Sequence, residues 1–384
     1  VQQEGAALRG PAAEVLQGLP AEPVADEGAS EEQKEAAKAG QEAYLDALIA
    51  RVQSLLGARY AGMQMFALQD QLTSIRATLE QFQVRFDGWY SECDLVESGT
   101  AQKARGQLVA SGHTYEKDGA LWFRTTERGD DKDRVLVRAN GVPTYFGNDL
   151  AYHVDKLGRG WDSVIDIWGA DHHGLLKRME AALEILTGKP STLKIELIQF
   201  VTLSSGRMGK RSGNFVTLQD LLDEAGPDAT RFFYLMRAHE QHLEFDIDLA
   251  RSKSNENPVF YVQYAHARIC SVFAQLKDKA GVYDRTAGLA ALARLDNEHE
   301  KRLLTALNRY PEVIRNAAAN HAPHAMAFYL KDEVADALHS YYNAHKFLGE
   351  DPALQNARLA LIEATRVVLK SGLALLGVSA PDSM

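Results

Sequence analysis

The pattern of apolar residues changes at Pro258, and this change limits the folds open to the chain. Upstream, strand-like runs alternate with helical periods. The clearest unit is a buried-strand pattern at Val164–Trp168, a glycine-containing turn and a long amphipathic helix. Such alternation predicts an α/β domain with a mostly parallel sheet, and the helices downstream predict an all-α bundle. The bundle helices are expected at about 259–280, 287–318, 325–348 and 353–376.

The first part of the chain differs in composition from the rest. Residues 1–40 are rich in Ala, Glu, Gly and Pro and contain no aromatic residue, which predicts disorder or a loose helix. Helical periods are expected from Glu42 and over Met65–Gln81, followed by a short strand within Val84–Trp89. We therefore divide the chain into a divergent segment (1–40), an α/β domain (41–257) and a helical domain (258–384).

The middle of the chain carries clear turn signals. Residues 101–113 are expected to be helical, and Gly112–Thr125 is expected to form a hairpin around the turn Lys117-Asp118-Gly119. A strand at Val135–Val137, an Asn-Gly turn and a helix entered near Asn148 follow. One further strand is expected over Lys194–Leu203.

The bulk composition is that of an ordinary globular protein. The 384 residues are 46% hydrophobic and 24% charged, and no run of eighteen apolar residues predicts a membrane span. The two cysteines, Cys93 and Cys270, are too few for a disulfide framework or a cysteine-based zinc site. No secretory signal is recognisable, so a cytoplasmic protein is expected. Because the sequence starts with Val1, we expect its natural start to lie upstream.

The charge is unevenly distributed. The net charge of −10 argues mildly against a nucleic-acid partner. From Pro258 onward, however, 14 Lys and Arg face 13 Asp and Glu, so the acidic excess lies upstream. An RNA-binding face in the helical part is therefore compatible with the composition.

A basic loop follows the strand that ends at Leu203. Arg207, Lys210 and Arg211 stand among three glycines, and a helix is expected near Leu218. Ligands of open α/β sheets bind beyond the carboxyl ends of strands, so the loop is a candidate phosphate site. The alternative is a solvated basic turn. The pattern is not a Walker A loop, because Gly-x-x-x-x-Gly-Lys-Ser/Thr is absent.

Tyr145 and Asp149 stand four residues apart at the start of a predicted helix, so both can point to one face. A phenol and a carboxylate together could bind a cationic, planar group such as guanidinium. The alternative is a core tyrosine beside an ordinary helix N-terminal carboxylate.

Asp171, His172 and His173 follow the end of the Val164–Trp168 strand, where polar groups often line a site. A metal site is disfavoured, because adjacent histidines point apart and no further ligand has a fitting spacing. The alternative is helix capping by Asp171, with one histidine packed and one exposed. Asp-His-His phosphoesterases need further early aspartates and a glycine-rich His loop, which we do not find.

Aromatic and basic residues recur in the predicted bundle. Aromatic rings beside cations suit stacking on unpaired bases and contact with phosphate. The alternative is a core stripe, since apolar residues accompany them at helical spacing. The candidate RNA-binding residues are Tyr261, Tyr264, Arg268, Tyr342 and Lys346.

These segments occur in one order, and in that order the chain resembles the bacterial arginyl-tRNA synthetases, a class I family. The resemblance covers nearly everything from about residue 82 to the end. It implies a Rossmann-type catalytic domain and a helical anticodon-binding domain. The similar segments include "VRFDGWYSE", "TYFGNDLAYHVDK", "DIWGADHHG", "RMGKRSGNFVTLQDLLDE", "SNENPVFYVQYAHARI" and "GLALLGVSAPDSM".

The resemblance also implies roles for the candidate residues. Lys210 matches the second lysine of the Lys-Met-Ser-Lys-Ser motif, which stabilises ATP phosphates, and Arg207 stands at the first lysine. Met208, Gly209 and Arg211 complete the implied ATP site. Tyr145 and Asp149 match the pair that grips the guanidinium of arginine. Asp171 and His173 are expected to line the same arginine site.

The family's other motif, of the His-x-Gly-His type, does not occur in the 384 residues. We therefore expect an arginine–tRNA ligase chain that lacks an N-terminal part and is inactive alone. Its expected partners are arginine, ATP with Mg²⁺ and the tRNA, with no membrane, no protein-bound metal and a monomeric full-length form. The alternative is a non-catalytic, synthetase-like tRNA-binding paralogue.

Overall fold

The computed structural model describes residues 16–19, 31–188, 193–204, 216–279, 281–349 and 351–384. The lysine and arginine residues predicted for the phosphate loop lie outside these ranges. The chain divides into two compact units, Val1–Glu80 and Gln81–Met384. Among the helices in the described ranges, none has the length and apolar character needed to span a bilayer.

The first unit contains helix α3 (Glu31–Leu56), and helix α4 (Arg59–Gln81) ends at its boundary. The predicted end of the second helix at Gln81 is confirmed. The first helix begins at Glu31, about ten residues before the expected start. Ala, Glu and Lys dominate residues 31–40, and these residue types favour helix even where no apolar face is present.

The second unit opens with an irregular segment. The predicted strand within Val84–Trp89 is wrong, because the described residues 82–91 contain no strand. Phe86 and Trp89 remain exposed and meet edge to face, with 5.3 Å between their ring centroids. Aromatic content favours a strand only where a neighbouring strand offers a surface to pack on, and these residues have none in the described chain. Helices α5 (Glu92–Glu97) and α6 (Thr100–Ala110) follow.

A three-stranded antiparallel sheet comes next, in the order β1-β2-β3. β1 (Thr114–Lys117) and β2 (Ala120–Phe123) form the predicted hairpin, and β3 (Arg134–Val137) pairs with β2. Asp118 and Gly119 both have positive φ, of 52° and 75°. A two-residue turn of that kind matches the twist of the strands it joins, which explains the Asp-Gly sequence.

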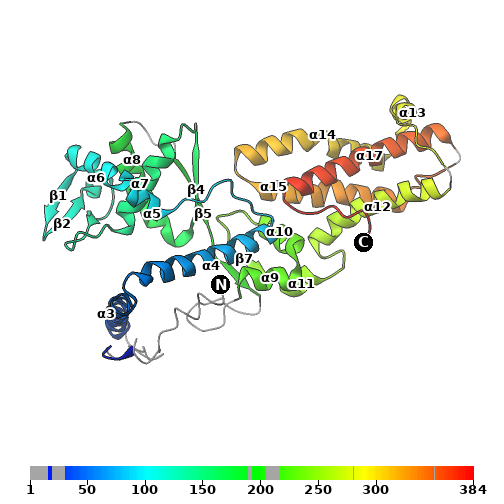
Figure 1. The fold of residues 1–384 in the computed structure, drawn as a ribbon. Helices are drawn as coiled ribbons and strands as arrows, with labels where there is room; N and C mark the ends of the chain where they lie inside the picture. The colour runs from blue at the N-terminus through cyan, green and yellow to red at the C-terminus, as the bar shows by residue number, and fades with distance from the viewer. Residues whose placement is uncertain (1–15, 20–30, 189–192, 205–215, 280, 350) are drawn as a thin grey trace. The chain divides into compact units, whose positions relative to one another are not determined.

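Helix α7 (Tyr145–Gly158) begins where the Thr144 hydroxyl accepts a hydrogen bond from the Gly147 amide at 3.3 Å. β4 (Val164–Gly169) then leads through the short 3₁₀ helix η2 (Ala170–Leu175) into α8 (Leu176–Thr187). Figure 1 shows α7 and α8 beside β4 and β5. These elements share one core, whose fully buried members include Leu136, Leu150, Met179 and Leu183.

The expected strand at Lys194–Leu203 is two strands, β5 (Leu193–Ile198) and β6 (Val201–Leu203). β5 pairs in parallel with β4, and β6 pairs in parallel with β7 (Leu243–Phe245). The parallel pairing is as predicted, but in the described residues it forms two separate pairs. At the break, the Gln199 backbone amide donates to the His239 carbonyl at 2.9 Å.

Helices continue from there to the end of the chain. α9 (Leu218–Ala225) confirms the helix expected near Leu218, and α10 (Pro227–Leu235) and α11 (Ile247–Arg251) lie on either side of β7 in the sequence. α12 (Pro258–Asp278) begins at Pro258, where the pattern changes. The remaining helices are α13 (Arg285–Ala290), η3 (Leu292–Arg294), α14 (Glu298–Ala319), α15 (Pro323–Phe328), the π-helical η4 (Tyr329–Ala335), α16 (Asp336–Ala344) and α17 (Pro352–Leu375).

The helix predicted over 287–318 is therefore split. α13 ends at Ala290, and Asn297 caps α14 with a capping box, in which the Glu300 carboxylate accepts a hydrogen bond from the Asn297 amide. The buried residues of α12, α14, η4, α16 and α17 belong to one hydrophobic cluster. Figure 1 shows α12, α14 and α17 lying side by side in this helical part.

Candidate functional site

Tyr145 and Asp149 lie one turn apart at the start of α7. The Tyr145 side chain is 86% exposed, so the alternative of a core tyrosine is wrong. Asp149 is half-buried, and burial raises the pKa of its carboxyl group although His153 and Lys156 act in the opposite direction. Within the described parts of the chain, no group forms a hydrogen bond or ion pair with the Asp149 carboxylate. A partly buried carboxylate of this kind is suited to a cationic ligand.

Sequence reasoning missed the residues beside this carboxylate. The Asn148 amide donates to Glu92 Oε1 at 2.8 Å, across 56 residues of sequence. The Asn148 side-chain oxygen is buried and has no partner in the described residues. An acceptor left in this state is unfavourable unless a ligand or water donates to it. Asn148 could have been predicted as a site residue, because it immediately precedes Asp149. Its partner Glu92 could not, because it is distant in the sequence.

One turn further along α7, His153 and Lys156 hold the buried carboxylate of Asp166. His153 bonds to one carboxylate oxygen, and Lys156 Nζ lies 2.5 Å from the other. Burial alone would raise the pKa of Asp166, but these two hydrogen bonds hold it below its ordinary value. His153 also meets Trp168 edge to face, so this group fixes α7 against β4.

The Asp171 and His173 side chains are both exposed, in η2 at the end of β4. His172 is exposed too, so the expectation that one histidine packs inside is wrong. Asp171 does not cap the helix, because no side chain bonds to the free amides at the start of η2. Its nearest charged neighbour is His172, at 3.9 Å. A place in the arginine site for Asp171 and His173 stays a prediction.

In the helical part, the structure brings together most of the predicted RNA-binding residues. The Arg268 guanidinium lies 4.5 Å from the ring centroid of Tyr264 and 4.7 Å from that of Tyr342. It also donates to His339 Nδ1 at 3.0 Å, and His339 Nε2 donates to the Tyr261 carbonyl at 3.0 Å. These bonds require neutral His339, and burial with the nearby Arg268 lowers its pKa accordingly.

Tyr261 and Lys346 stand apart from this stack in different ways. Tyr261 donates its hydroxyl to Asp336 at 3.1 Å, and burial together with Asp336 raises its pKa to about 12. Tyr261 therefore has a structural role between α12 and α16. This agrees with the alternative interpretation of a core stripe. Lys346 is exposed beyond the end of α16. RNA binding by the five residues stays a prediction.

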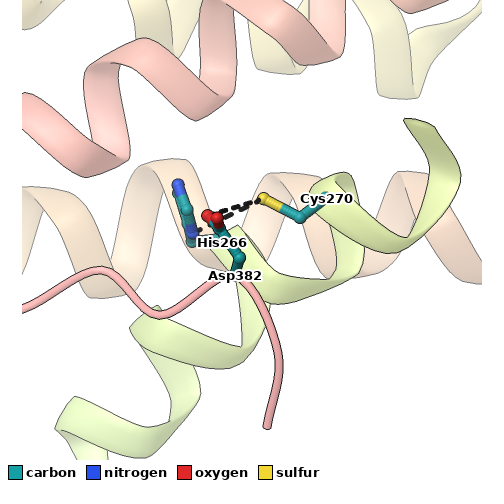
Figure 2. A group of neighbouring side chains, drawn as sticks. All are labelled: His266, Cys270 and Asp382. Carbon is teal, nitrogen blue, oxygen red and sulfur yellow. Dashed lines mark hydrogen bonds between the residues drawn. The ribbon is translucent and has the colours of Figure 1, made fainter. Parts of the chain in front are cut away.

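A further polar cluster joins α12 to the C-terminal tail (Figure 2). His266 and Cys270 lie one turn apart on α12, with 3.8 Å between Nδ1 and Sγ, and Cys270 Sγ lies 3.4 Å from Asp382 Oδ1. The three ligand atoms are close enough together to hold a metal ion, which the cysteine count did not anticipate. However, His266 Nδ1 lies 2.9 Å from the Pro381 carbonyl, so it carries a proton and donates there. The cluster is therefore suited to holding the tail rather than a metal.

Comparison with known proteins decides the family. A family model for the DALR anticodon binding domain matches residues 262–384. The arginine–tRNA ligase of Legionella pneumophila (strain Corby) is 53% identical over 348 residues, 89% of this chain and 59% of that protein. A structure assigned as an arginyl-tRNA synthetase from Campylobacter jejuni is 31% identical, with a TM-score of 0.77 over 94% of this chain and 78% of that one. The chain belongs to the arginyl-tRNA synthetase family.

This family membership confirms the predicted fold class, a Rossmann-type α/β region followed by a helical anticodon-binding domain. The arginyl-tRNA synthetase of Thermus thermophilus has the same fold, with 25% identity, a TM-score of 0.69, and coverage of 92% of this chain and 68% of that one. The chain spans about three fifths of the length of the curated relatives it matches. The phosphoesterase alternative is excluded.

Proposed function

We propose that this chain supplies the arginine-binding and tRNA-binding parts of an arginine–tRNA ligase in the cytoplasm. The reaction would join arginine to ATP as arginyl-adenylate, release pyrophosphate, and transfer arginine to the 3′ end of its tRNA. Positioning and charge stabilisation account for most of the catalysis in such a scheme. Family membership and the site on α7 support the proposal.

The observation that carries it is the state of Asp149. Its carboxylate is half-buried, has a raised pKa, and meets no donor in the described ranges. Burying such an unpaired charge costs free energy of folding, and a cationic ligand would compensate for this cost. The exposed Tyr145 hydroxyl is one turn away, and the buried Asn148 oxygen lacks a donor. A guanidinium carries five N–H donors and one positive charge, which matches this set of acceptors.

Calorimetric titration with L-arginine tests the proposal. L-Arginine should bind, whereas L-citrulline, which has a similar shape but no charge, should not. Asp149→Asn should weaken arginine binding about ten- to hundredfold, because a hydrogen bond to a charged group contributes about 1.5–3 kcal/mol. Asp155→Asn is the matched control on the same helix, since Asp155 already pairs with Arg159. Unchanged affinity in Asp149→Asn, or no binding by the original chain, would contradict the proposal.

The phosphate-binding part of the proposal rests on the loop outside the described residues. Lys210 and Arg207 would neutralise the phosphates of ATP and the leaving pyrophosphate, with Met208, Gly209 and Arg211 completing the contact. Mg²⁺ would enter with ATP as part of the substrate. Because the His-x-Gly-His motif is not in this sequence, we expect no arginine-dependent pyrophosphate exchange by this chain alone.

For the tRNA, the proposal assigns contacts to Tyr264, Arg268 and Tyr342, with Tyr261 in support and Lys346 on a phosphate. Lys346→Ala should lower affinity for the tRNA. It should also reduce by about one the slope of the logarithm of the binding constant against the logarithm of the salt concentration. Lys370→Ala, an exposed lysine on α17, is the control. Fluorescence anisotropy measures both affinities. If the two substitutions weaken tRNA binding equally, Lys346 does not contact the tRNA.

A non-catalytic tRNA-binding paralogue is the second candidate, because the stack of Tyr264, Arg268 and Tyr342 would serve such a protein equally well. Such a protein would bind tRNA but would have no use for a guanidinium site. Arginine binding that depends on Asp149 would therefore exclude this candidate.

A further inference from the structure

The described residues of the second unit pack into two separate main cores. The first core holds buried residues of β3, α7, α8, β4 and β5, and its members run from Leu108 to Leu193. The second core holds buried residues of β6, β7 and the helices around and after them, from Leu203 to Val378. The chain passes from one core to the other between β5 and β6, where the strand pairing also breaks. Parts with their own cores can move against each other about such a break.

The carboxylate of Glu196 in β5 spans this break. It accepts a hydrogen bond from His321 Nδ1 at 2.5 Å, and His239 Nε2 lies 2.8 Å from its other oxygen. His239 precedes β7 and His321 follows α14, so both imidazoles stand between elements of the second core. The bond from His321 holds the pKa of Glu196 below its ordinary value, and the charges of His239 and Lys194 act in the same direction. The carboxylate is therefore ionised at neutral pH, which strengthens both bonds.

His321 has a backbone conformation that favours glycine. Its φ of 49° is left-handed, and it ends α14 in a Schellman motif, in which the Ala322 amide donates to the Ala317 carbonyl at 2.8 Å. Glycine usually occupies this position, because an L side chain is strained there. The imidazole of this strained residue reaches Glu196, 125 residues earlier in the sequence. Backbone strain combined with a long-range bond indicates that the bond has a role.

We propose that Glu196, His239 and His321, together the Glu196 bridge, form a latch that limits hinge motion between the two cores. The hinge is the segment from Ile198 to Val201, where the Gln199 amide donates to the His239 carbonyl at 2.9 Å. His239 thus contacts the hinge through its backbone and Glu196 through its side chain. Because the helical domain belongs to the second core, the latch controls how freely this domain moves relative to β4 and β5. The inference does not depend on the substrate of the protein.

Hydrogen exchange at the Gln199 amide tests the latch in the full chain. Glu196→Gln and His321→Gly should each speed this exchange about tenfold or more, because each removes a hydrogen bond that involves a charged group. Glycine is the sharpest replacement for His321, since it removes the imidazole and suits the left-handed backbone. Glu244→Gln, the same change at an exposed position in β7, is the control and should leave the exchange rate unchanged.

The double variant shows whether the two residues act through one bond. If they do, Glu196→Gln combined with His321→Gly should exchange no faster than Glu196→Gln alone. Additive effects overturn the proposal, and so does an unchanged Gln199 rate in Glu196→Gln. A His321→Gly chain that melts at a higher temperature with the Gln199 rate unchanged also overturns it, because the histidine would then add strain without holding the hinge.

Spin labels measure the motion itself. One label is placed on the exposed Cys93 of α5, which packs on α7 through Leu95 and Ala151. The other is placed in the loop after α12 by Val282→Cys, with Cys270→Ser to leave one label in each part. The distribution of distances between the labels should broaden in Glu196→Gln and in His321→Gly but not in Glu244→Gln. Equal widths in all four chains, each with a cooperative melt, would refute the latch.

Discussion

At the scale of single residues, two carboxylates of the catalytic part have opposite surroundings. Asp149 lies half-buried without a partner, so burial raises its pKa. Asp166 is more deeply buried, yet His153 and Lys156 hold its pKa below the ordinary value. Groups shifted by burial alone concentrate at functional sites, whereas fully paired groups more often support the structure. This contrast favours the proposed role of Asp149 in ligand binding and a structural role for Asp166.

Asp149→Asn should stabilise the chain near neutral pH while it weakens arginine binding. A carboxyl group whose folded pKa is raised contributes stability only at low pH, and this contribution is lost as the pH rises through the folded value. At pH 7 the ionised carboxylate therefore opposes folding, and its removal should raise the melting temperature. The gain should vanish below about pH 4, where the group is protonated in both states. A lower melting temperature at pH 7 would contradict the assignment.

Asp166→Ala should have the opposite effect and destabilise the chain by about 3–5 kcal/mol, because it leaves His153 and Lys156 without their buried partner. The folded pKa of Asp166 is depressed, so its stabilisation is present above the unfolded pKa of about 4 and is lost as the pH falls through the folded value. Urea unfolding at pH 7 and in acid measures the loss of stability in Asp166→Ala and its dependence on pH. The control Asp162→Ala, at an exposed position before β4, should change the free energy of unfolding little. If both variants lose the same stability, the ion pair at Asp166 is not the cause.

At the scale of elements, turn residues and hydrophobic periodicity predicted the helices and strands that depend on nearby residues. The Asp118-Gly119 hairpin, the strand β4 and the helices after Gly169 and Thr217 follow from turn residues and periodicity, and the structure confirms them. The predicted burial of β4 holds for one face only, because Ile165 and Ile167 are exposed. The failures depend on distant partners. Val84–Trp89 has strand-like residues but no neighbouring strand, and 287–318 keeps a helical period across the break between Ala290 and Asn297. Pairing and close approach between helices are not encoded locally.

Gly288 shows such a close approach. A Cβ at this position of α13 would lie 2.5 Å from the backbone oxygen of Asn356 in α17. Gly288→Ala should therefore destabilise the chain by about 1–3 kcal/mol, since backbone atoms must move. Gly106→Ala in α6 is the control, because no atom lies within 4 Å of its Cβ and alanine favours a helix by about 1 kcal/mol. Thermal melts of both variants check the opposite signs. A stabilised Gly288→Ala would show that α13 is not held against α17.

At the scale of the whole molecule, short motifs predicted which candidate site residues lie close together, but not the contacts that hold them in place. Tyr145 with Asp149, and Tyr264 with Arg268, are four apart on single helices, so spacing alone placed them together. The Asn148–Glu92 bond and the ion pair at Asp166 join different elements, and no pattern within one segment indicates them. The same holds for the C-terminal tail, whose partners lie more than a hundred residues upstream.

That tail connects α10, just before β7 in the sequence, with α12 of the helical part. Asp228 of α10 accepts from the Ser379 amide at 3.0 Å and from Gln263 Nε2 at 2.8 Å. Asp228→Ala should leave these donors unsatisfied, at a cost of about 1–3 kcal/mol, and the Ser379 amide should exchange its hydrogen faster. Asp278→Ala, exposed at the end of α12, should change neither. Unchanged exchange at Ser379 in Asp228→Ala would mean that the two parts of the chain are not joined through Asp228.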